Sequence, residues 1–298
     1  MKYNDLGTTG LKVSELGLGC AGYWGFPVFS EEKALSLVHQ AAEKGVTFFD
    51  TGSSYSGGHS EPRLGRALKS IGDREKLVIS TKIGTVMNRR FLTKDFSPDA
   101  LLKQLEQSRR NLDMDCLPVV MLHLPSLNDL NNQTYDFMEE VKSRGWVRCF
   151  GASCDGEVLD KVLNADRFDC VMMDYNLLNQ APIRQVHEAR EKGIGVLLKS
   201  PLAHTLYSNR VFRIRSLADF WYFLRVLKNY RPYFYKGLKY RFVNNQDNLT
   251  GHEIALLFAL KSMASSAVVG TTRIESLEAN LRALGRELPQ DLYERLLD

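Results

Sequence analysis

Short runs of apolar residues alternate with longer amphipathic segments along most of the chain. The runs are rich in β-branched and aromatic residues, which predicts buried strands, and they begin at residues 15, 46, 76, 118, 147, 168, 194 and 266. A helical pattern follows each run; after the third one, Leu101, Leu105 and Leu112 recur at helical spacing. Because alternation implies parallel strands joined by right-handed crossovers, we predict an α/β fold of the closed (β/α)8 (TIM) barrel type.

Local signals refine this order. Residues 2–13 hold two short extended runs around a glycine-bearing turn, which predicts a β-hairpin that closes the bottom of the barrel. Ser30 is the expected N-cap of the first helix, and Thr250–Glu253 and Thr272–Glu275 both match a capping box. Residues 203–249 form a long insert after the seventh strand.

A doubly wound sheet is the competing fold. The run Gly17-Leu-Gly-Cys-Ala-Gly22 matches GxGxxG after a strand, as in dinucleotide-binding folds. In that fingerprint the helix begins at the third glycine, whereas residues 23–29 separate Gly22 from Ser30 here. We therefore interpret the match as accidental.

Composition limits the function classes. The 298 residues suit one barrel domain spanning 1–298, and 44% hydrophobic with 25% charged residues is typical of a globular protein. No apolar run approaches the ~20 residues that span a bilayer, and the first residues lack signal-peptide features, so we expect a cytoplasmic protein without a membrane partner. The net charge of +4 does not argue for nucleic acid but tolerates an anionic ligand.

The cysteines predict neither a disulfide nor a metal site. Their number is odd and none shows CxxC or His/Cys metal spacing, so we expect reduced and mostly buried thiols. They are Cys20, Cys116, Cys149, Cys154 and Cys170.

Three ionisable residues end apolar strand runs. Asp50, Lys82 and His123 each occupy such a position, and Tyr55 lies just beyond Asp50. Each alone has an ordinary explanation, such as a rim salt bridge, a core histidine or a loop aromatic. Barrel closure would bring all four to one rim, and burying a lysine together with an acid needs a purpose that stability rarely supplies.

This set suits proton donation to a carbonyl. A phenol is a weak acid near neutrality, but Lys82, held by Asp50 beside Tyr55, would favour the phenolate. His123 would orient the substrate oxygen. Since no side chain supplies hydride, a nicotinamide cofactor is implied. A Schiff-base aldolase using Lys82 is an alternative chemistry for a barrel lysine.

Several segments in order resemble the aldo-keto reductase family over essentially the whole length. They are Leu6–Ser14, Phe49–Thr51 with Tyr55, Ser60–Leu68, Thr81–Lys82, Leu122–His123, Gly151–Ser153, Tyr175–Asn176 and Val269–Thr271 with Leu277 and Asn280. The resemblance implies a catalytic tetrad of Asp50, Tyr55, Lys82 and His123, with Tyr55 as proton donor to an aldehyde or ketone. It also implies a small-molecule carbonyl substrate, or the matching alcohol, and a monomer or weak oligomer.

The resemblance also implies the cofactor residues. They are Ser153, Met172, Lys199, Ser200, Leu202, Gly270, Thr272, Arg273 and Asn280. Arg273 at a helix start suggests a 2′-phosphate site, so we expect NADPH rather than NADH, with NADH possible. Cys154 and Met172 stand where the family has an amide, and Lys199 where many members have an aromatic ring. These departures leave open a nicotinamide-binding regulatory or sensor protein with little turnover.

The insert has two interpretations. Basic residues interleaved with aromatics can mark a surface for single-stranded nucleic acid. However, Leu217, Trp221, Leu224 and Leu227 fit one helix face, and no RNA-binding signature accompanies them, so we predict a packed helix and no nucleic-acid partner. A loop at this place would reach over the cofactor and wall the substrate pocket, as a lid does. The candidate apolar walls of the substrate pocket are Trp24, Phe26 and Trp221.

Overall fold

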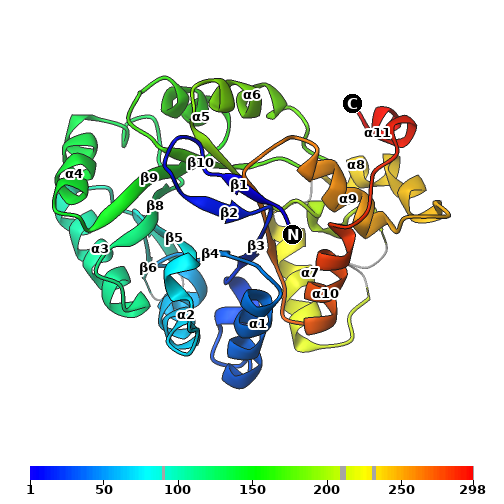
Figure 1. Ribbon diagram of the computed structural model, residues 1–298, viewed down its shortest axis with the longest axis horizontal. Coiled ribbons are helices and arrows are strands. Elements are labelled where there is room, and N and C mark those ends of the chain that lie inside the picture. The colour runs from blue at the N-terminus through cyan, green and yellow to red at the C-terminus, as the bar shows by residue number, and fades with distance from the viewer. Residues whose placement is uncertain (89–90, 209–212, 230–232, 298) are drawn as a thin grey trace.

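The computed structural model describes residues 1–88, 91–208, 213–229 and 233–297. The strands are β1 (Tyr3–Asp5), β2 (Lys12–Ser14), β3 (Leu16–Gly19), β4 (Phe48–Asp50), β5 (Val78–Ile83), β6 (Thr85–Asn88), β7 (Phe91–Lys94), β8 (Leu117–His123), β9 (Val147–Ser153), β10 (Cys170–Asp174), β11 (Gly195–Lys199) and β12 (Ser266–Gly270). The helices are α1 (Glu31–Glu43), α2 (Ser60–Leu68), α3 (Pro98–Leu112), α4 (Asn132–Ser143), α5 (Gly156–Leu163), α6 (Ile183–Glu191), α7 (Leu217–Asn229), α8 (Tyr233–Lys239), α9 (Gly251–Leu260), α10 (Ile274–Ala283) and α11 (Gln290–Leu296). Figure 1 shows the helices arranged around the outside of the barrel.

Eight parallel strands form a closed barrel in the order β3-β4-β5-β8-β9-β10-β11-β12. Pairing of β12 with β3, which sets Gly270 opposite Gly19, closes the ring. All eight predicted strands are therefore confirmed, and a doubly wound sheet is excluded. The glycine motif is no dinucleotide fingerprint, because a 3-10 turn at Gly22–Gly25 follows β3 and α1 begins only at Glu31.

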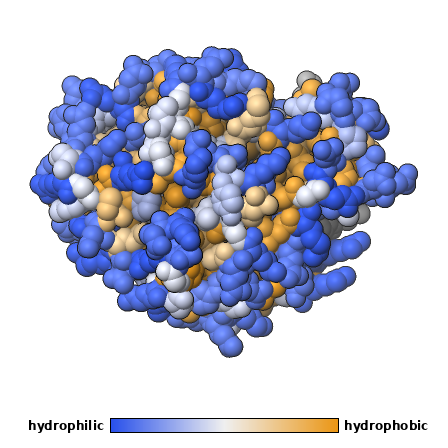
Figure 2. Space-filling view, in the orientation of Figure 1, coloured by the Kyte–Doolittle hydropathy of each residue, from blue (hydrophilic) through white to orange (hydrophobic). Residues whose placement is uncertain are grey.

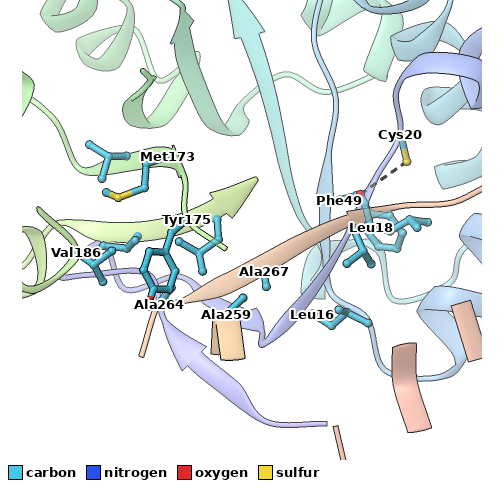
Figure 3. Packing of buried hydrophobic residues seen from close by; sticks show 14 of the residues in the cluster. Leu16, Leu18, Cys20, Phe49, Met173, Tyr175, Val186, Ala259, Ala264 and Ala267 are labelled. Atoms are coloured by element: carbon cyan, nitrogen blue, oxygen red, sulfur yellow. Dashed lines mark hydrogen bonds between the residues drawn. The ribbon is translucent and has the colours of Figure 1, made fainter. Parts of the chain in front are cut away.

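Buried apolar side chains form two layers, as the alternation of strand residues requires. The inner layer fills the barrel and includes Phe48, Val78, Val119, Met121, Cys149, Cys170, Met172, Leu197 and Val268. The outer layer lies between strands and helices, and Figure 3 shows part of it with Leu16 and Leu18 of β3, Val186 of α6 and Ala259 of α9. Figure 2 shows a mostly hydrophilic outer face with apolar side chains visible between the polar ones. Each fully buried large aliphatic or aromatic side chain stabilises the fold by about 1.5–3 kcal/mol.

The predicted N-terminal hairpin closes the bottom of the barrel. Strands β1 and β2 pair antiparallel, and Leu6 and Leu11 join the inner apolar layer. Gly7 has a φ of +56°, and a Cβ there would lie 2.3 Å from the carbonyl oxygen of Gly193. Only glycine therefore permits this turn to approach the start of β11.

Two of the three predicted helix starts are confirmed. Ser30 accepts a hydrogen bond from the Lys33 amide, and Thr250 with Glu253 forms a complete capping box. The capping box predicted at Thr272 is wrong, because Arg273 is the N-cap residue of α10 and makes no side-chain cap. Instead, Thr271 Oγ1 accepts a hydrogen bond of 3.1 Å from the Arg273 amide.

The insert contains α7, α8 and a 3-10 turn at Arg241–Asn245. A helix was predicted there, but its predicted buried face is wrong: Leu217, Leu224 and Leu227 are exposed. Among the α7 residues whose burial the structure describes, Val226 is buried, and it lies one turn beyond the half-buried Tyr222. The antiparallel hairpin of β6 and β7 was not predicted. Among the described helices, none has the length and apolar character needed to cross a membrane.

Candidate active site

The carboxyl ends of the barrel strands bring Asp50 and Lys82 together. Asp50 is the last residue of β4, and Lys82 lies on the adjacent strand β5. The Lys82 Nζ atom donates to both Asp50 carboxylate oxygens at 2.5 and 2.6 Å and to the Thr51 carbonyl at 2.9 Å. Burial by itself lowers the pKa of the Lys82 ammonium, but Asp50 and Tyr55 outweigh that effect and raise the pKa above its ordinary value. Lys82 is therefore a buried ammonium whose charged form Asp50 and Tyr55 stabilise.

Tyr55 lies between this cation and His123. The Lys82 Nζ atom is 4.9 Å from the centre of the Tyr55 ring, within the range of a cation–π contact. On its other side, Tyr55 meets His123 edge to face, with ring centres 5.4 Å apart and an angle of 77°. The structure thus brings together all four residues that were predicted to share one rim.

His123 is held in its neutral form. Its Nδ1 atom is 2.7 Å from Thr85 Oγ1, which in turn lies 2.9 Å from Ser54 Oγ. Burial, followed by the charges of Lys82, Lys199 and Lys94, lowers the His123 pKa to about 3. A neutral imidazole has one donor and one acceptor nitrogen, so His123 can still hydrogen-bond a substrate oxygen while Thr85 fixes its ring.

A cleft of about 320 Å³ opens in front of these residues. Most predicted site residues line it: Trp24, Asp50, Tyr55, Lys199, Ser200, Leu202, Trp221, Gly270, Thr272, Arg273 and Asn280. Lys82 and His123 are buried beside it. Ser153 is buried at the end of β9, and Met172 belongs to the inner apolar layer of the barrel. Neither Ser153 nor Met172 lines the cleft, and Phe26 packs on Trp221 instead of lining it.

Lys199 ends β11 and forms an ion pair at the rim. Its Nζ atom donates to Asp155 Oδ2 at 2.6 Å, and Asp155 Oδ1 accepts from the Asp174 amide at 2.8 Å. Burial raises the Asp174 pKa to about 6; Lys199 opposes this change and Asp155 adds to it. Lys199 therefore contributes a fixed charge to a cleft wall where a neutral ring was the family expectation.

Strained backbone follows Lys199. Ser200, Ala203, His204 and Thr205 all have φ between 46° and 55°. Each non-glycine residue in this left-handed region costs about 1–2 kcal/mol. Ser200, His204 and Thr205 line the cleft, so the strain is stored in a wall of the site.

Helix α7 closes the cleft from the outside. Trp221 contacts Phe26 and Tyr23 with ring centres 5.7 and 6.3 Å apart. Gly22 has a φ of +62°, and a Cβ there would lie 2.8 Å from Trp221. At the other side of the cleft, Asp219 of α7 accepts a hydrogen bond of 3.3 Å from Arg273. The helix thus bridges the loop after β3 and the start of α10.

Comparison with known proteins agrees with this geometry. The model of the Aldo/keto reductase family matches residues 15–297. The chain belongs to this family. The holo form of the aldo-keto reductase AKR11C1 from Bacillus halodurans superposes with a TM-score of 0.84 at 26% identity, covering 99% of this chain and 95% of that one.

Two curated relatives of this aldo-keto reductase have names that describe different roles, a reductase and a channel subunit. The NADH-specific methylglyoxal reductase of Escherichia coli is 28% identical over an alignment of 232 positions, which covers 72% of this chain and 71% of that protein. A probable voltage-gated potassium channel subunit beta of Arabidopsis thaliana is 27% identical over an alignment of 307 positions, which covers 95% of this chain and 91% of that protein. Both align with most of this chain, so proteins with different named roles resemble it over most of its length.

The cleft fits the nicotinamide dinucleotide that aldo-keto reductases use. The Oδ1 atom of Asn280 is buried, lines the cleft side of α10 and has no hydrogen-bond partner among the described residues. A buried acceptor without a donor costs about 1–3 kcal/mol, which a ligand amine would recover. The start of α10, with Thr272 and Arg273 on the cleft, adds backbone N–H groups and one cation for an anionic group.

Sequence reasoning missed several residues that shape the site. Thr85 lies on β6, a strand that was not predicted, so its contact with His123 was not predicted either. Asp155 follows a predicted strand and Asp174 ends one. Their positions in the sequence could therefore have indicated that both lie at the rim of the barrel. Asp219 gave no signal, because its role depends on how the insert folds back toward Arg273.

Proposed function

We propose that this aldo-keto reductase reduces an aldehyde or ketone, or oxidises the matching alcohol, with Tyr55 as the proton donor. The observation that supports this role is the position of the Lys82 ammonium between the Asp50 carboxylate and the Tyr55 ring. A cation held beside a phenol stabilises the phenolate that remains after proton transfer. We therefore assign to Tyr55 the donation of a proton to the carbonyl oxygen.

The other residues have separate tasks in this proposal. Asp50 fixes the Lys82 side chain and balances its charge in a buried site. His123, neutral and fixed by Thr85, donates or accepts a hydrogen bond at the substrate oxygen and so orients the carbonyl toward Tyr55. Bound nicotinamide supplies the hydride. Trp24 and Trp221 form apolar walls of the pocket.

Residues that face the cleft or its base would hold the dinucleotide. Asn280 offers its buried acceptor to the adenine amine, and Thr272 with Arg273 takes a phosphate. Ser200, Leu202 and Gly270 would form the middle wall and Lys199 the wall at the nicotinamide end. Ser153, which is buried at the end of β9 and does not line the cleft, is the proposed carboxamide contact. We assign NADPH as the preferred cofactor because Arg273 carries a charge suited to a 2′-phosphate.

A nicotinamide-binding regulatory protein is the second candidate. It is favoured by Cys154, Met172 and Lys199, which replace family side chains, and by the resemblance to a probable potassium channel subunit. A Schiff-base aldolase is disfavoured, because a nucleophilic lysine needs a lowered pKa whereas the Lys82 pKa is raised.

Turnover on a carbonyl panel separates these functions. The purified protein is titrated with NADPH and NADH by cofactor fluorescence, and each complex is then offered aldehydes, ketones and sugars. Cofactor oxidation on any substrate supports the reductase. Tight nucleotide binding with no oxidation on the whole panel would support the regulatory role instead, and trapping of a substrate on Lys82 by borohydride would support the aldolase.

A further inference from the structure

A second cavity adjoins the cleft, with a volume of about 640 Å³. It lies between the insert and the start of α10. The described residues that line it are Tyr207, Ser208, Arg213, Arg215, Asp219, Arg241, Asn244, Asn245 and Arg273. Asp219 and Arg273 also line the cleft, so the two spaces meet at this ion pair. A ligand that extends from Tyr55 along the cleft toward α10 therefore reaches the second cavity.

The lining of this second cavity is strongly basic. Four arginines and one acid, Asp219, are among its described residues. The carboxylate of Asp219 is already engaged, because it accepts from Arg273 at 3.3 Å and from the Ser216 hydroxyl at 2.9 Å. Like charges gathered in one cavity repel each other, so an anion bound there would stabilise the arrangement.

The walls that carry these arginines are tied to each other. Asn244 donates to the carbonyls of Tyr207 and Arg241 at 2.7 and 2.9 Å, which joins the two ends of the insert. At the start of α7, the Arg215 amide donates to Asp219 Oδ2 at 3.2 Å. These contacts hold the backbone at Arg215 and Arg241 in place before any ligand binds.

Most of this charge comes from the insert and not from α10. Arg273 is the one basic residue between Gly270 and Arg282, and its partner Asp219 offsets it. Arg213, Arg215 and Arg241 all belong to the insert. Guanidinium groups form two parallel hydrogen bonds to phosphate oxygens, which makes a phosphate monoester the matching ligand.

We propose that Arg213, Arg215 and Arg241 bind the 2′-phosphate of NADPH and determine the preference for NADPH over NADH. The proposal rests on the proposed function, since it assumes a dinucleotide in the adjoining cleft. It adds three insert residues to Arg273, whose charge Asp219 offsets, in the recognition of this phosphate. The insert then serves both as a cover for the cleft and as the part of the chain that recognises the cofactor type.

Binding calorimetry with NADP⁺ and NAD⁺ tests this assignment without any turnover. The triple variant Arg213→Ala/Arg215→Ala/Arg241→Ala is compared with the wild type. Each charge-assisted hydrogen bond lost corresponds to roughly a 10-fold to 100-fold weaker Kd. We expect the Kd for NADP⁺ to rise by at least about 100-fold. The Kd for NAD⁺ should stay near its wild-type value, so the preference for NADP⁺ disappears.

A control variant removes the same charge elsewhere. Arg110→Ala/Arg144→Ala/Arg184→Ala changes exposed arginines in α3, at the C-cap of α4 and in α6, and both affinities should be unchanged. The lysine variant of the three insert positions should lie between wild type and the alanine variant, because a point charge replaces the planar fork.

Three results would overturn the proposal. They are a wild-type preference for NAD⁺, an equal loss of both affinities in the alanine variant, and inorganic phosphate binding to the NADP⁺-saturated protein at this cavity. None of these results tests the proposed proton donation by Tyr55. If neither nucleotide binds to the wild type, the proposed function fails as well, and the two failures are thereby distinguished.

Discussion

Lys82 donates to both carboxylate oxygens of Asp50, at 2.5 and 2.6 Å, and both side chains are almost completely buried from solvent. Such a pair is costly to break, because one partner alone leaves an uncompensated buried charge. We expect Asp50→Asn to lower the free energy of unfolding by about 3–5 kcal/mol, as measured by denaturant unfolding.

The double variant Asp50→Asn/Lys82→Met separates stability from function. Removal of both charges should restore much of the lost stability, since buried ion pairs are often replaced by apolar groups at little cost. Turnover should nevertheless stay at background, because no cation remains beside Tyr55. A double variant with normal turnover would show that the pair is structural.

The His123 pKa predicts how stability depends on pH. The pKa is about 3 in the folded protein and near 6.5 in the unfolded chain, so the unfolded chain takes up the proton first as the pH falls. The stability that comes from a neutral His123 is present above pH 6.5 and is lost toward pH 3, by about 1.4 kcal/mol per pH unit. Below pH 6, His123→Gln should therefore lose stability less steeply than the wild type in urea unfolding. Parallel slopes for the two proteins would contradict a buried neutral imidazole.

Asp174 predicts the opposite trend. Its pKa is about 6 in the folded protein, against an ordinary value of 3.8, so the folded protein holds this proton more tightly than the unfolded chain does. The free energy of unfolding therefore falls as the pH rises from 3.8 through 6. Asp174→Asn should be more stable than the wild type by about 3 kcal/mol at pH 7 and about equally stable near pH 4. Thermal unfolding at both pH values checks this difference, and an Asp174→Asn variant that is less stable at pH 7 would refute it.

Trp221 predicts how fast the nucleotide leaves. Its ring joins α7 to Tyr23 and Phe26, and the Asp219–Arg273 pair at the other side is exposed and adds only about 0–1 kcal/mol. Trp221→Ala should therefore speed nucleotide dissociation by about 10-fold while the barrel keeps its stability. Stopped-flow fluorescence measures the rate. In the matched variant Leu224→Ala, which changes an exposed position of the same helix, the rate should be unchanged.

The barrel strands and the clustering of Asp50, Tyr55, Lys82 and His123 at one rim could be predicted because both follow from local patterns. An apolar run that ends in an ionisable residue marks both a strand and its functional end, so Asp50, Lys82 and His123 were found together. The hairpin turn at Gly7 and the N-cap at Ser30 are likewise encoded by neighbouring residues.

The insert could not be predicted to the same degree. The sequence suggested Leu217, Leu224 and Leu227 as a buried face, but α7 turns Val226 inward because it packs on the loop after β3. Its direction depends on contacts between Trp221, Phe26 and Gly22, which lie far apart in the chain. The pairing of Asp219 with Arg273 could not be predicted either, because these residues also lie far apart in the chain.

The most direct test of the central claim is the variant Tyr55→Phe, assayed for turnover and for NADPH binding on the same preparation. Loss of a general acid lowers kcat by about 10²–10⁴-fold. Since the phenol ring and its contacts with Lys82 and His123 are retained, the Kd for NADPH should stay at the wild-type value. Wild-type kcat in Tyr55→Phe would contradict proton donation by Tyr55.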